Sequence, residues 1–549
     1  MGKRSIFLTE PRPQIKNLDM LPVIDRSLID YDKYHQFIVM AGIKYSMAIQ
    51  ATRGCPYECF YCDVYKTAKF HRRRSVEHLI NEIRLLADIG IKRIDFIDDI
   101  FNVNKKECAS FFELVLKRRL DLKFYFPTGL RGDILNKDMI DLMVEAGTIG
   151  VNLSLEHPSP RLQKVMRKNL NVEKLHENIK YIAEKYPSVV LGLNVMHGFP
   201  TETEEEALST LEFIKSIRWL HFPYFHTVRI FPGTELEKFA LGSGIPKDLI
   251  EQSQQMPYHE DPPTLPFSQR FTKSVKTEFL REYVLSKERL LHVLPYQMEQ
   301  FTEDELNQKY NSYFPTRIKT LDDLLGITKI DRAELRNKQC IDESQNRIRN
   351  LKTRIRTKFL PAVTKKRNAL RLILIDLTTY FSHDAGTHEY NVLEPPFGLM
   401  ALLSYINKEF GDRVEGKIYK PRIDFDSYEE LYNLIDNFNP DIIGVRAMTL
   451  YKDFFHETIA NMRRYGITVP IIVGGPYPTA SYREILQDKN INLTVVAEGE
   501  VTLADILEKT IANNKQLPDA EVLKKIPGVA FLEEAADMPT ADAVETFVA

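Results

Sequence analysis

Three cysteines stand within eight residues of one another in the string RGCPYECFYC: Cys55, Cys59 and Cys62. Three thiolates on one short loop can each hold a different iron of a [4Fe-4S] cluster, which leaves the fourth iron open to another ligand. A structural zinc ion or cluster normally takes a fourth protein ligand, and Cys108 and Cys340 are too distant in sequence to suggest one. The spacing also differs from paired zinc knuckles. We therefore predict a cluster with one open iron rather than three unrelated thiols.

Strands and helices alternate from about Ser46 to Phe231, which indicates a parallel sheet. Gly147 and the pair Thr203 and Glu206 predict a helix end and a capping box. The expected strands are 46–52, 93–98, 122–128, 149–156, 189–198 and 222–231, with helices at 76–90, 106–119, 138–147, 173–186 and 203–217. Six such units predict an α/β fold, a partial (β/α)6 TIM-type barrel. The cysteine loop follows the first strand, at the end where barrels carry their chemistry.

A second α/β domain is expected over residues 370–532, as a doubly wound, Rossmann-like sheet of four or five strands. Its strands are predicted at 371–377, 441–449, 469–475 and 493–500. Ligands of such sheets bind in the turns at the carboxyl ends of the strands. The glycines of those turns, Gly474, Gly475 and Gly499, would let a ligand approach the backbone closely. No G-x-G-x-x-G follows the first strand, so a dinucleotide is not indicated.

The remaining segments complete the predicted domains: an irregular, extended arm at 1–45, the barrel at 46–236, a mostly helical extension with a basic linker at 237–369, and a tail at 533–549. Residues 347–371 carry ten Lys or Arg and no acid, and suit either a solvated linker helix or a phosphate or membrane contact. Tyr258, Phe267 and Tyr296 in the extension are either pocket-lining or ordinary core residues.

The bulk composition is that of an ordinary globular protein, with 44% apolar and 27% charged residues. A formal net charge of −2 indicates no nucleic-acid partner, and five cysteines in 549 residues form no disulfide framework. The chain shows no signal peptide and no apolar run that would span a bilayer. We expect a cytoplasmic protein.

The cysteine loop, the six-unit barrel and its strand-end motifs together resemble the radical S-adenosylmethionine (SAM) enzymes over about residues 46–236. In that family the open iron binds SAM, and an electron from the cluster splits SAM into methionine and a 5′-deoxyadenosyl radical. The resemblance implies an electron donor such as flavodoxin or ferredoxin. It makes Cys55, Cys59 and Cys62 the cluster ligands.

The same resemblance implies the SAM contacts. Tyr61 would lie beside the adenine, and Asp98 or Asp99 of IDFIDDIF would receive the amino group. Arg131 of LRGDIL would point toward the SAM site, and Glu156 of NLSLEH would contact the ribose. Gly198 and Pro200 of HGFPTETEEE would form the turn after strand five. His157 and Ser154 replace the usual Ser and Gly of the Glu156 motif. Asp98 and Asp99 could instead cap the next turn, and Glu156 could be a solvent-facing strand end with Arg131 as its partner.

Residues 370–532 resemble the cobalamin-binding domain that accompanies one class of these enzymes. PPFGLMALLSYI, PDIIGVRAMT, PIIVGGPYPT and VVAEGEVTLADIL stand in the order of that family. The resemblance implies cobalamin contacts from Met448, Thr449, Gly474, Gly475, Gly499 and Glu500. The Asp-x-His-x-x-Gly motif is absent, and SHDAGTH has the wrong spacing, so we expect no His ligand on the lower face of the corrin. Arg446 stands where many relatives carry Ser. Alternatively, the fold serves as a scaffold without a corrin.

The order of the two domains is unusual, because relatives usually place the cobalamin domain first. IPGVAFLEE near the end of this chain and SIFLTEPRPQIKNLDMLPVIDR near its start look like the two sides of the connector that joins the domains in those relatives. We infer a circular permutation with 347–371 as the new join, and expect Met1 and residue 532 to approach each other. A domain-swapped dimer is the competing geometry.

The sequence therefore predicts a cobalamin-dependent radical SAM enzyme, most simply a methyltransferase that acts on an unactivated carbon of a small molecule or natural product. One alternative keeps the cofactors without methyl transfer, in a ring-closing, rearranging or oxidising enzyme. Another is a non-catalytic cobalamin or redox sensor, although the chain shows no output module for one.

Overall fold

The computed structural model describes residues 4–34, 46–64, 68, 70–256, 260–313, 318, 320–336, 338–342, 348–359, 365–383 and 393–534. The chain forms two compact units, each assembled from separated stretches. One unit comprises Met1–Gln14, Thr364–Thr378 and Ile406–Ala549, and the other comprises Ile15–Val363 and Thr379–Tyr405. No helix in the described part of the chain has both the length and the apolar composition needed to cross a bilayer.

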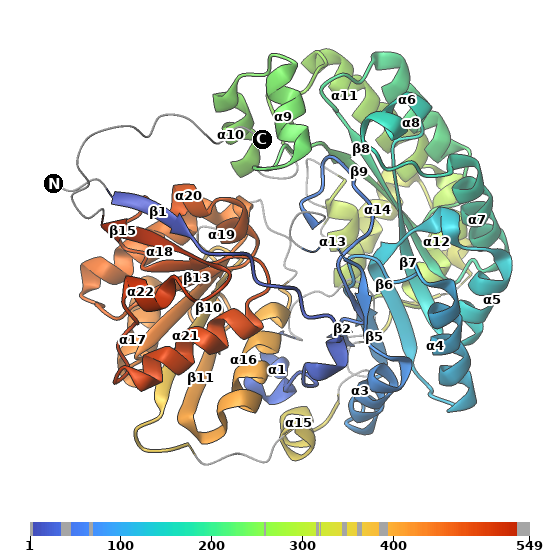
Figure 1. Ribbon diagram of the computed structural model, residues 1–549. Coiled ribbons are helices and arrows are strands. Elements are labelled where there is room, and N and C mark those ends of the chain that lie inside the picture. The colour runs from blue at the N-terminus through green and yellow to red at the C-terminus, as the bar shows by residue number, and fades with distance from the viewer. Residues whose placement is uncertain are drawn as a thin grey trace. The chain divides into compact units, whose positions relative to one another are not determined.

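The larger unit is built on the predicted partial barrel. Its six strands are β2 (Ser46–Ile49), β5 (Arg93–Phe96), β6 (Lys123–Leu130), β7 (Thr148–Glu156), β8 (Val190–His197) and β9 (Phe222–Thr227). They pair in chain order, and every pairing is parallel. Parallel neighbours in chain order are the pattern of a TIM-type barrel, here with six of its eight strands. Figure 1 shows this curved sheet in blue to green.

Helices cover the outer face of the barrel strands (Figure 1). They are α3 (Val76–Asp88), α4 (Lys105–Lys117), α5 (Lys137–Glu145), α6 (Pro160–Val165), α7 (Val172–Lys185) and α8 (Glu204–Lys215). Phenylalanines of β5, α4 and β6 form a shared core: the rings of Phe96 and Phe126 stack with centroids 4.8 Å apart. The predicted helix signals are confirmed, since Gly147 has φ +107° and Thr203 and Glu206 form the capping box of α8.

The segment after the barrel is mostly helical, as predicted. It contains α9 (Glu235–Gly242), α10 (Lys247–Gln255), α11 (Gln269–Glu278), the π-helix η4 (Phe279–Val284), α12 (Lys287–Met298), α13 (Glu303–Asn311), α14 (Leu321–Thr328), η5 (Arg332–Leu335) and α15 (Leu351–Phe359). The basic helix α15 buries Leu351 and Ile355. Lys352 pairs with Asp30 at 2.6 Å and Lys358 with Asp88 at 3.0 Å. These contacts favour the linker-helix interpretation of the basic segment.

Residues 15–34 are not simply an extended arm. They form two 3-10 helices, η1 (Leu18–Met20) and η2 (Arg26–Leu28), and one turn of helix, α1 (Tyr31–Tyr34). Arg26 is fully buried and pairs with Glu82 of α3 at 2.7 Å. Arg74 pairs with the other oxygen of the same carboxylate at 2.6 Å. A buried carboxylate between two guanidiniums ties this segment to the barrel.

The smaller unit contains a seven-stranded sheet, where we expected four or five strands. Its order is β1-β15-β14-β13-β12-β10-β11. The strands are β1 (Arg4–Leu8), β10 (Leu370–Leu377), β11 (Val414–Tyr419), β12 (Ile442–Ala447), β13 (Ile471–Gly474), β14 (Leu493–Val495) and β15 (Val529–Glu534). The five parallel strands have the flavodoxin-like order 2-1-3-4-5, whose topological switch point lies between β10 and β12.

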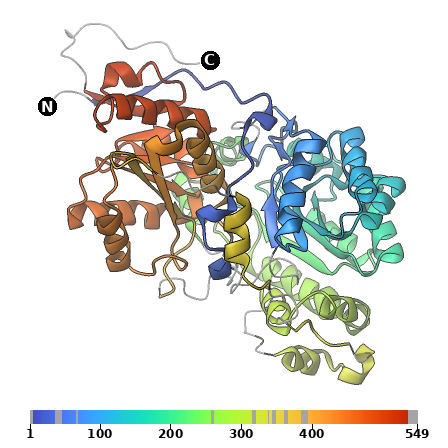
Figure 2. The same ribbon diagram turned by 90° about the horizontal axis from the view of Figure 1, so that it is seen from below.

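Helices lie on both faces of this sheet (Figure 2). They are α17 (Tyr428–Phe438), α18 (Lys452–Tyr465), α19 (Pro476–Ala480), α20 (Tyr482–Ile485), α21 (Glu500–Ala512) and α22 (Ala520–Leu523), with the short 3-10 helices η7 (Gly411–Arg413) and η8 (Thr449–Tyr451). Helix α16 (Phe397–Phe410) begins in the larger unit and ends in the smaller one. The doubly wound prediction is therefore confirmed, while β11, α17 and β15 were not foreseen.

The two ends of the described chain meet in one sheet. Strand β1 pairs antiparallel with β15, with Arg4 opposite Glu534 and Ile6 opposite Leu532 (Figure 1). The prediction of an irregular arm is therefore wrong for residues 4–8, because their hydrogen-bonding partner lies more than 500 residues away in sequence. The expectation that residue 532 approaches the start of the chain is confirmed at the first described residues.

Candidate functional site

The three cysteines lie on the loop that leaves β2, at the carboxyl end of the barrel strands. Two short strands of this loop, β3 (Thr52–Arg53) and β4 (Arg72–Arg73), pair antiparallel. The Cys62 N–H donates to the Cys59 carbonyl at 3.0 Å, and the Cys55 N–H donates to the Ala68 carbonyl at 3.3 Å. Gly54 has φ +83°, and a Cβ there would lie 2.4 Å from the Ala68 oxygen. The loop thus needs glycine before its first cysteine.

The thiols of this loop influence one another. Burial raises the pKa of Cys62 to about 12, and the negative charges of Cys59 and Cys55 add to the effect. Burial also raises the pKa values of Cys55 and Cys59. Three half-buried thiols gathered on one loop fit the donor set of a cluster, whose iron charge would stabilise the thiolates. In the described residues, no three His, Cys, Asp or Glu side chains surround a point suited to one metal ion. A [4Fe-4S] cluster does not need that, because each thiolate binds a different iron.

Asp98 and Asp99 follow β5 and hold the start of the cysteine loop. The Asp98 Oδ1 accepts the Ala51 N–H at 3.0 Å, the Thr52 hydroxyl at 2.6 Å and the Thr52 N–H. The Asp99 Oδ2 accepts the Gly54 N–H at 2.9 Å. Both carboxylates therefore hold the turn that leads from β2 into the cysteine loop, and not the next turn of the chain, which was the alternative interpretation of this motif.

Asp98 keeps one unused acceptor. Its Oδ2 is buried and has no hydrogen-bond partner among the described residues. Burial raises the pKa of Asp98 to about 6 despite its hydrogen bonds from Thr52. A buried acceptor without a donor fits a ligand that brings an amine, which is the group expected from SAM.

Glu156 and Tyr61, which we predicted to contact the ribose and the adenine of SAM, lie together. The Tyr61 hydroxyl donates to the Glu156 Oε1 at 3.2 Å, and the Lys168 ammonium donates to the same oxygen at 2.7 Å. Glu156 has φ +64°, an uncommon conformation for a residue that is not glycine. Lys168 was missed in the sequence because it reaches Glu156 from the loop after α6, twelve residues later.

Arg131 is held beside the cysteine loop but does not pair with Glu156. It forms a two-pronged pair with Asp133, with its Nε 2.9 Å from the Asp133 Oδ1. Its guanidinium also lies over the ring of Tyr57, 4.0 Å from the centroid. The suggested partnership between Arg131 and Glu156 is therefore wrong.

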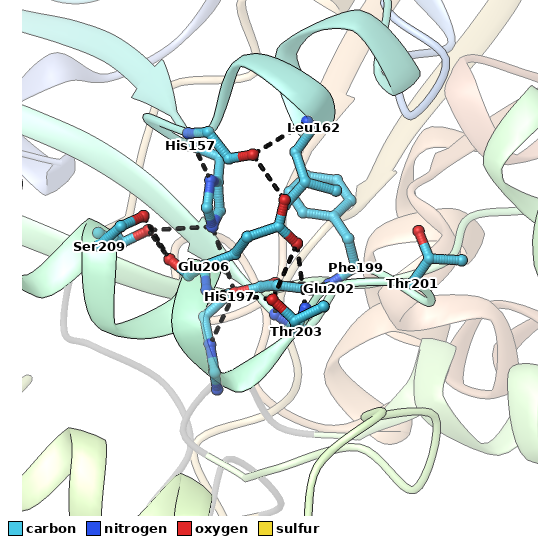
Figure 3. A network of polar contacts seen from close by, with 12 residues as sticks. His157, Leu162, His197, Phe199, Thr201, Glu202, Thr203, Glu206 and Ser209 are labelled. Atoms are coloured by element: carbon cyan, nitrogen blue, oxygen red, sulfur yellow. Dashed lines mark hydrogen bonds and ion pairs between the residues drawn. The ribbon is translucent and has the colours of Figure 1, made fainter.

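A buried network of two histidines and a glutamate supports the carboxyl ends of β7 and β8 (Figure 3). The Glu202 Oε1 lies 3.3 Å from both His157 Nε2 and His197 Nδ1. Its Oε2 accepts the N–H groups of Gly198 at 2.6 Å and Phe199 at 3.0 Å. The predicted glycine turn after strand five is thus anchored by a carboxylate. Pro200 lies in the same turn, two residues before Glu202.

The hydrogen bonds of this network indicate which ring nitrogen of His157 carries a proton. The Ser159 N–H donates to His157 Nδ1 at 3.0 Å, so Nε2 carries the ring proton of the neutral imidazole. Burial alone would raise the pKa of Glu202, but hydrogen bonds from His157 and His197 lower it to about 2. Phe267 stacks on His197 with centroids 4.7 Å apart, so this aromatic residue packs at the carboxyl end of β8.

A polar ladder crosses three neighbouring barrel strands next to Glu156. Asn194 donates to the Ser154 hydroxyl at 3.4 Å and accepts from His226 Nε2 at 3.1 Å. Leu153, whose side chain points the opposite way along β7, packs toward Leu175 of the outer helix α7 at Gly132. Because side chains alternate along a strand, the ladder faces the barrel interior. These are the polar groups a substrate inside the barrel would meet.

The carboxyl edge of the smaller sheet carries a buried ion cluster. Asp376 of β10 pairs with Lys420 at 2.8 Å and with Arg446 of β12 at 2.6 Å. Thr378 donates to Asp376 at 3.0 Å. Burial alone would raise the pKa of Asp376, but the two cations lower it. The cluster spans the switch point between β10 and β12, where ligands of such sheets bind.

The predicted cobalamin residues occupy the same edge. Met448, which follows β12, is 39% exposed, an unusual state for a large apolar side chain, and Thr449 begins η8. Gly474 ends β13, and Gly475 precedes α19 with φ +97°. Gly499 precedes α21 in an ordinary helical conformation, φ −91°, so no special backbone freedom is used there. Glu500 is buried. An exposed apolar side chain beside polar groups fits a corrin, with its apolar faces and amide arms.

Some expectations fall outside the described residues, namely Tyr258 and all of SHDAGTH after its first two residues. Tyr296 lies in α12, half-buried, with His292 as its ring neighbour at 6.1 Å. Cys108 is buried in α4 and Cys340 is half-buried.

Comparison with known protein families agrees with both halves of the chain. Residues 49–214 match the Radical SAM superfamily, and residues 386–507 match the B12 binding domain. The chain therefore carries a region that matches the radical SAM superfamily, followed by a region that matches the B12 binding domain. The two domains imply a [4Fe-4S] cluster, SAM and cobalamin as the cofactors of this chain.

Individual relatives cover parts of this chain. An uncharacterized methyltransferase of Pyrococcus horikoshii, PH0819, is 30% identical over 237 residues, which are 43% of this chain and 50% of the relative. A tRNA-2-methylthio-N(6)-dimethylallyladenosine synthase of Aquifex aeolicus is 27% identical over 207 residues, 36% of this chain and 47% of that protein. The chain thus spans about half the length of the curated relatives it matches.

Among solved structures, the radical SAM methyltransferase TsrM from Kitasatospora setae has 20% identity and a TM-score of 0.33, over 36% of this chain and 39% of TsrM. The cobalamin-dependent radical enzyme OxsB has 17% identity and a TM-score of 0.29, over 57% of this chain and 54% of OxsB.

Proposed function

We propose that this radical SAM enzyme transfers a methyl group from SAM to an unactivated carbon of a small-molecule substrate. The observation that carries the proposal is the presence, in one chain, of a three-cysteine loop on a partial barrel and of a B12-binding sheet. The 30% identity, over 237 residues, to a protein named as an uncharacterized methyltransferase supports it. When bound, the cluster supplies the electron that cleaves SAM, and cobalamin carries the methyl group.

The residues of the chain have separate tasks in this proposal. Cys55, Cys59 and Cys62 would hold three irons. The free Oδ2 of Asp98 would accept the SAM amino group, and Glu156 with Tyr61 would orient the ribose and adenine. The ladder of Ser154, Asn194 and His226 would contact the substrate inside the barrel, where the surrounding strands keep water from a radical. Reducing equivalents would come from a flavodoxin or a ferredoxin.

The test of the cofactor assignment is anaerobic purification from cobalamin-replete cells, with iron and cobalamin counted per chain. We expect about four irons and about one cobalamin. Cys59→Ala should lose the cluster and form no 5′-deoxyadenosine from SAM under reducing conditions. The matched control is Cys108→Ala, a buried cysteine on α4. It should keep about four irons. A Cys59→Ala protein that still cleaves SAM would refute the cluster assignment.

The test of methyl transfer uses SAM labelled in its methyl group, incubated with small-molecule extracts. We expect the label in a new product, with S-adenosylhomocysteine and 5′-deoxyadenosine formed together. A product without the labelled methyl group would instead identify a ring-closing, rearranging or oxidising enzyme with the same cofactors.

A further inference from the structure

Arg446 occupies the space that a glycine turn leaves open at the edge of the smaller sheet. A Cβ on Gly475 would lie 2.9 Å from the Arg446 Cγ and 3.6 Å from its Cδ. The missing side chain of Gly475 therefore accommodates the stem of Arg446. We expected this glycine to admit a ligand, and it admits an arginine.

The position of Arg446 is fixed by a buried anion. Its Nη1 donates to the Asp376 Oδ1 at 2.6 Å, and Asp376 is 1% exposed. Lys420, itself 4% exposed, donates to the other oxygen of Asp376 at 2.8 Å. Two cations thus share one buried carboxylate. Asp424 is the other acid near the cluster, and it accepts the backbone N–H of Lys420 at 3.0 Å.

The guanidinium of Arg446 has donors left over. It carries five N–H groups in a planar fork, and one nitrogen is spent on Asp376. The side chain remains 25% exposed, so the other donors can meet a ligand. A planar, permanently charged fork suits the two oxygens of a phosphate ester better than a neutral amide arm. The chemistry of the position therefore favours an anionic phosphodiester.

We propose that Arg446, aligned by Asp376 and seated against Gly475, binds the phosphodiester of the nucleotide arm of cobalamin. That phosphodiester is the anionic group of the cofactor. The proposal rests on cobalamin binding, on which the proposed methyl transfer also depends. It assigns a role to the residue that stands where relatives often carry Ser, and it predicts that this protein distinguishes cobamides with a complete nucleotide arm from those without one.

The experiment compares two ligands on the purified full-length protein by absorbance titration: hydroxocobalamin, and diaquocobinamide, which lacks the phosphodiester and the base. We expect the wild type to bind hydroxocobalamin at least about tenfold more tightly, because charge-assisted hydrogen bonds are strong. Arg446→Gln keeps a donor for Asp376 but loses the charge. It should weaken hydroxocobalamin binding about tenfold and leave cobinamide binding unchanged.

The controls separate the possible failures. Arg464→Ala removes an exposed cation of α18, in the same unit, and should change neither affinity. Equal weakening of both ligands by Arg446→Gln would overturn the proposal, because Arg446 would then act only on the fold. Tighter hydroxocobalamin binding by the variant would also overturn it, because Arg446 would then block the arm. A wild type that binds cobinamide but not hydroxocobalamin overturns it as well, whereas binding of neither ligand refutes the cobalamin assignment itself.

Discussion

At the residue scale, the acidic side chains of the barrel edge perform two kinds of work. The Oδ2 of Asp99, both oxygens of Glu202 and the Oδ1 of Asp98 accept hydrogen bonds from backbone, threonine or histidine donors and hold turns in place. The second oxygen of Asp98 is buried without a partner in the described structure. A fully satisfied carboxylate stabilises the fold, whereas an unsatisfied one is expected to meet a ligand. Whether a carboxylate oxygen already has a hydrogen-bond donor therefore distinguishes a structural role from a ligand-binding role better than its place in a motif does.

Glu202 provides a direct test of the supporting role. Glu202→Gln would turn an anion that accepts four donors into a neutral amide with only one acceptor oxygen. We expect a loss of about 2–4 kcal/mol in the free energy of unfolding of the barrel unit, because buried donors lose their partner. Denaturant unfolding followed by circular dichroism measures this. Glu205→Gln, an exposed position three residues later in the first turn of α8, should change stability by less than about 0.5 kcal/mol.

The same residue predicts a pH dependence. The pKa of Glu202 is about 2 in the folded protein and near 4.3 in an unfolded chain. Because the folded pKa is the lower one, the stabilisation is present above the unfolded value and is lost as the pH falls toward 2. The stability difference between wild type and Glu202→Gln should therefore shrink between about pH 5 and pH 2. A difference that is independent of pH over this window would contradict the charge-based role of Glu202.

At the candidate site, the sequence predicted the residues that belong to motifs of fixed spacing. It missed residues that contact one another only after the chain has folded. The cysteine loop and the proximity of Glu156 to Tyr61 followed from motifs. Lys168 and His197 did not, because their partners are set by how α6 and the turn after β8 fold back. A His at the end of β8 five residues before Glu202 was the available signal. That signal could not be interpreted from the sequence, because Glu202 also contacts His157, forty residues before His197.

At the element scale, regular periodicity explains which strands could be predicted. The six barrel strands are apolar runs between amphipathic helices, and each expected strand overlaps an observed one. Strand β11 was missed because VEGKIY has a mixed pattern, half-buried at the edge of its sheet. The approach of these two segments was expected, but β1 and β15 were not predicted as paired strands, because the strand partner of β1 lies more than 500 residues away in sequence. Local sequence carries no record of such a partner.

The polar ladder of the barrel is likewise an element-scale feature. Ser154, Asn194 and His226 come from three strands. Ser154 lies opposite Asn194 in the β7–β8 pairing, whereas Asn194 contacts His226, which lies two residues beyond its register partner Tyr224 on β9. Burial lowers the pKa of His226, and the Nε2 proton is directed at Asn194. In a neutral imidazole that donates from Nε2, Nδ1 is an acceptor, which would favour a substrate with a hydroxyl or N–H group.

At the scale of the whole molecule, the pairing of β1 with β15 supports the inferred permutation. In the usual order of relatives, a cobalamin domain would run directly into the segment before the barrel. In this chain the two segments are not joined covalently. They form an antiparallel strand pair in which Arg4 and Glu534 lie opposite each other. Antiparallel partners at the end of a ladder can be joined by a short hairpin turn. The chain could thus be closed at this point with little change in its fold.

A rearranged chain tests this directly. Residue 534 would be joined to residue 4 by an Asn-Gly turn. The chain would be opened before residue 365, ahead of the first residue of β10. Because the new turn closes a pair already in register, we expect the same far-ultraviolet circular dichroism, a thermal midpoint within a few degrees of the wild type, and unchanged hydroxocobalamin binding. A second chain, opened within β10 between Ile373 and Leu374, interrupts a central strand and should fail to fold.

Light scattering of the first rearranged chain also tests the domain-swapped alternative. A folded monomer is expected, because the joined pair lies within one chain. A rearranged chain that unfolds, or that folds only as a dimer, would reject the permutation and favour exchange of domains between two copies.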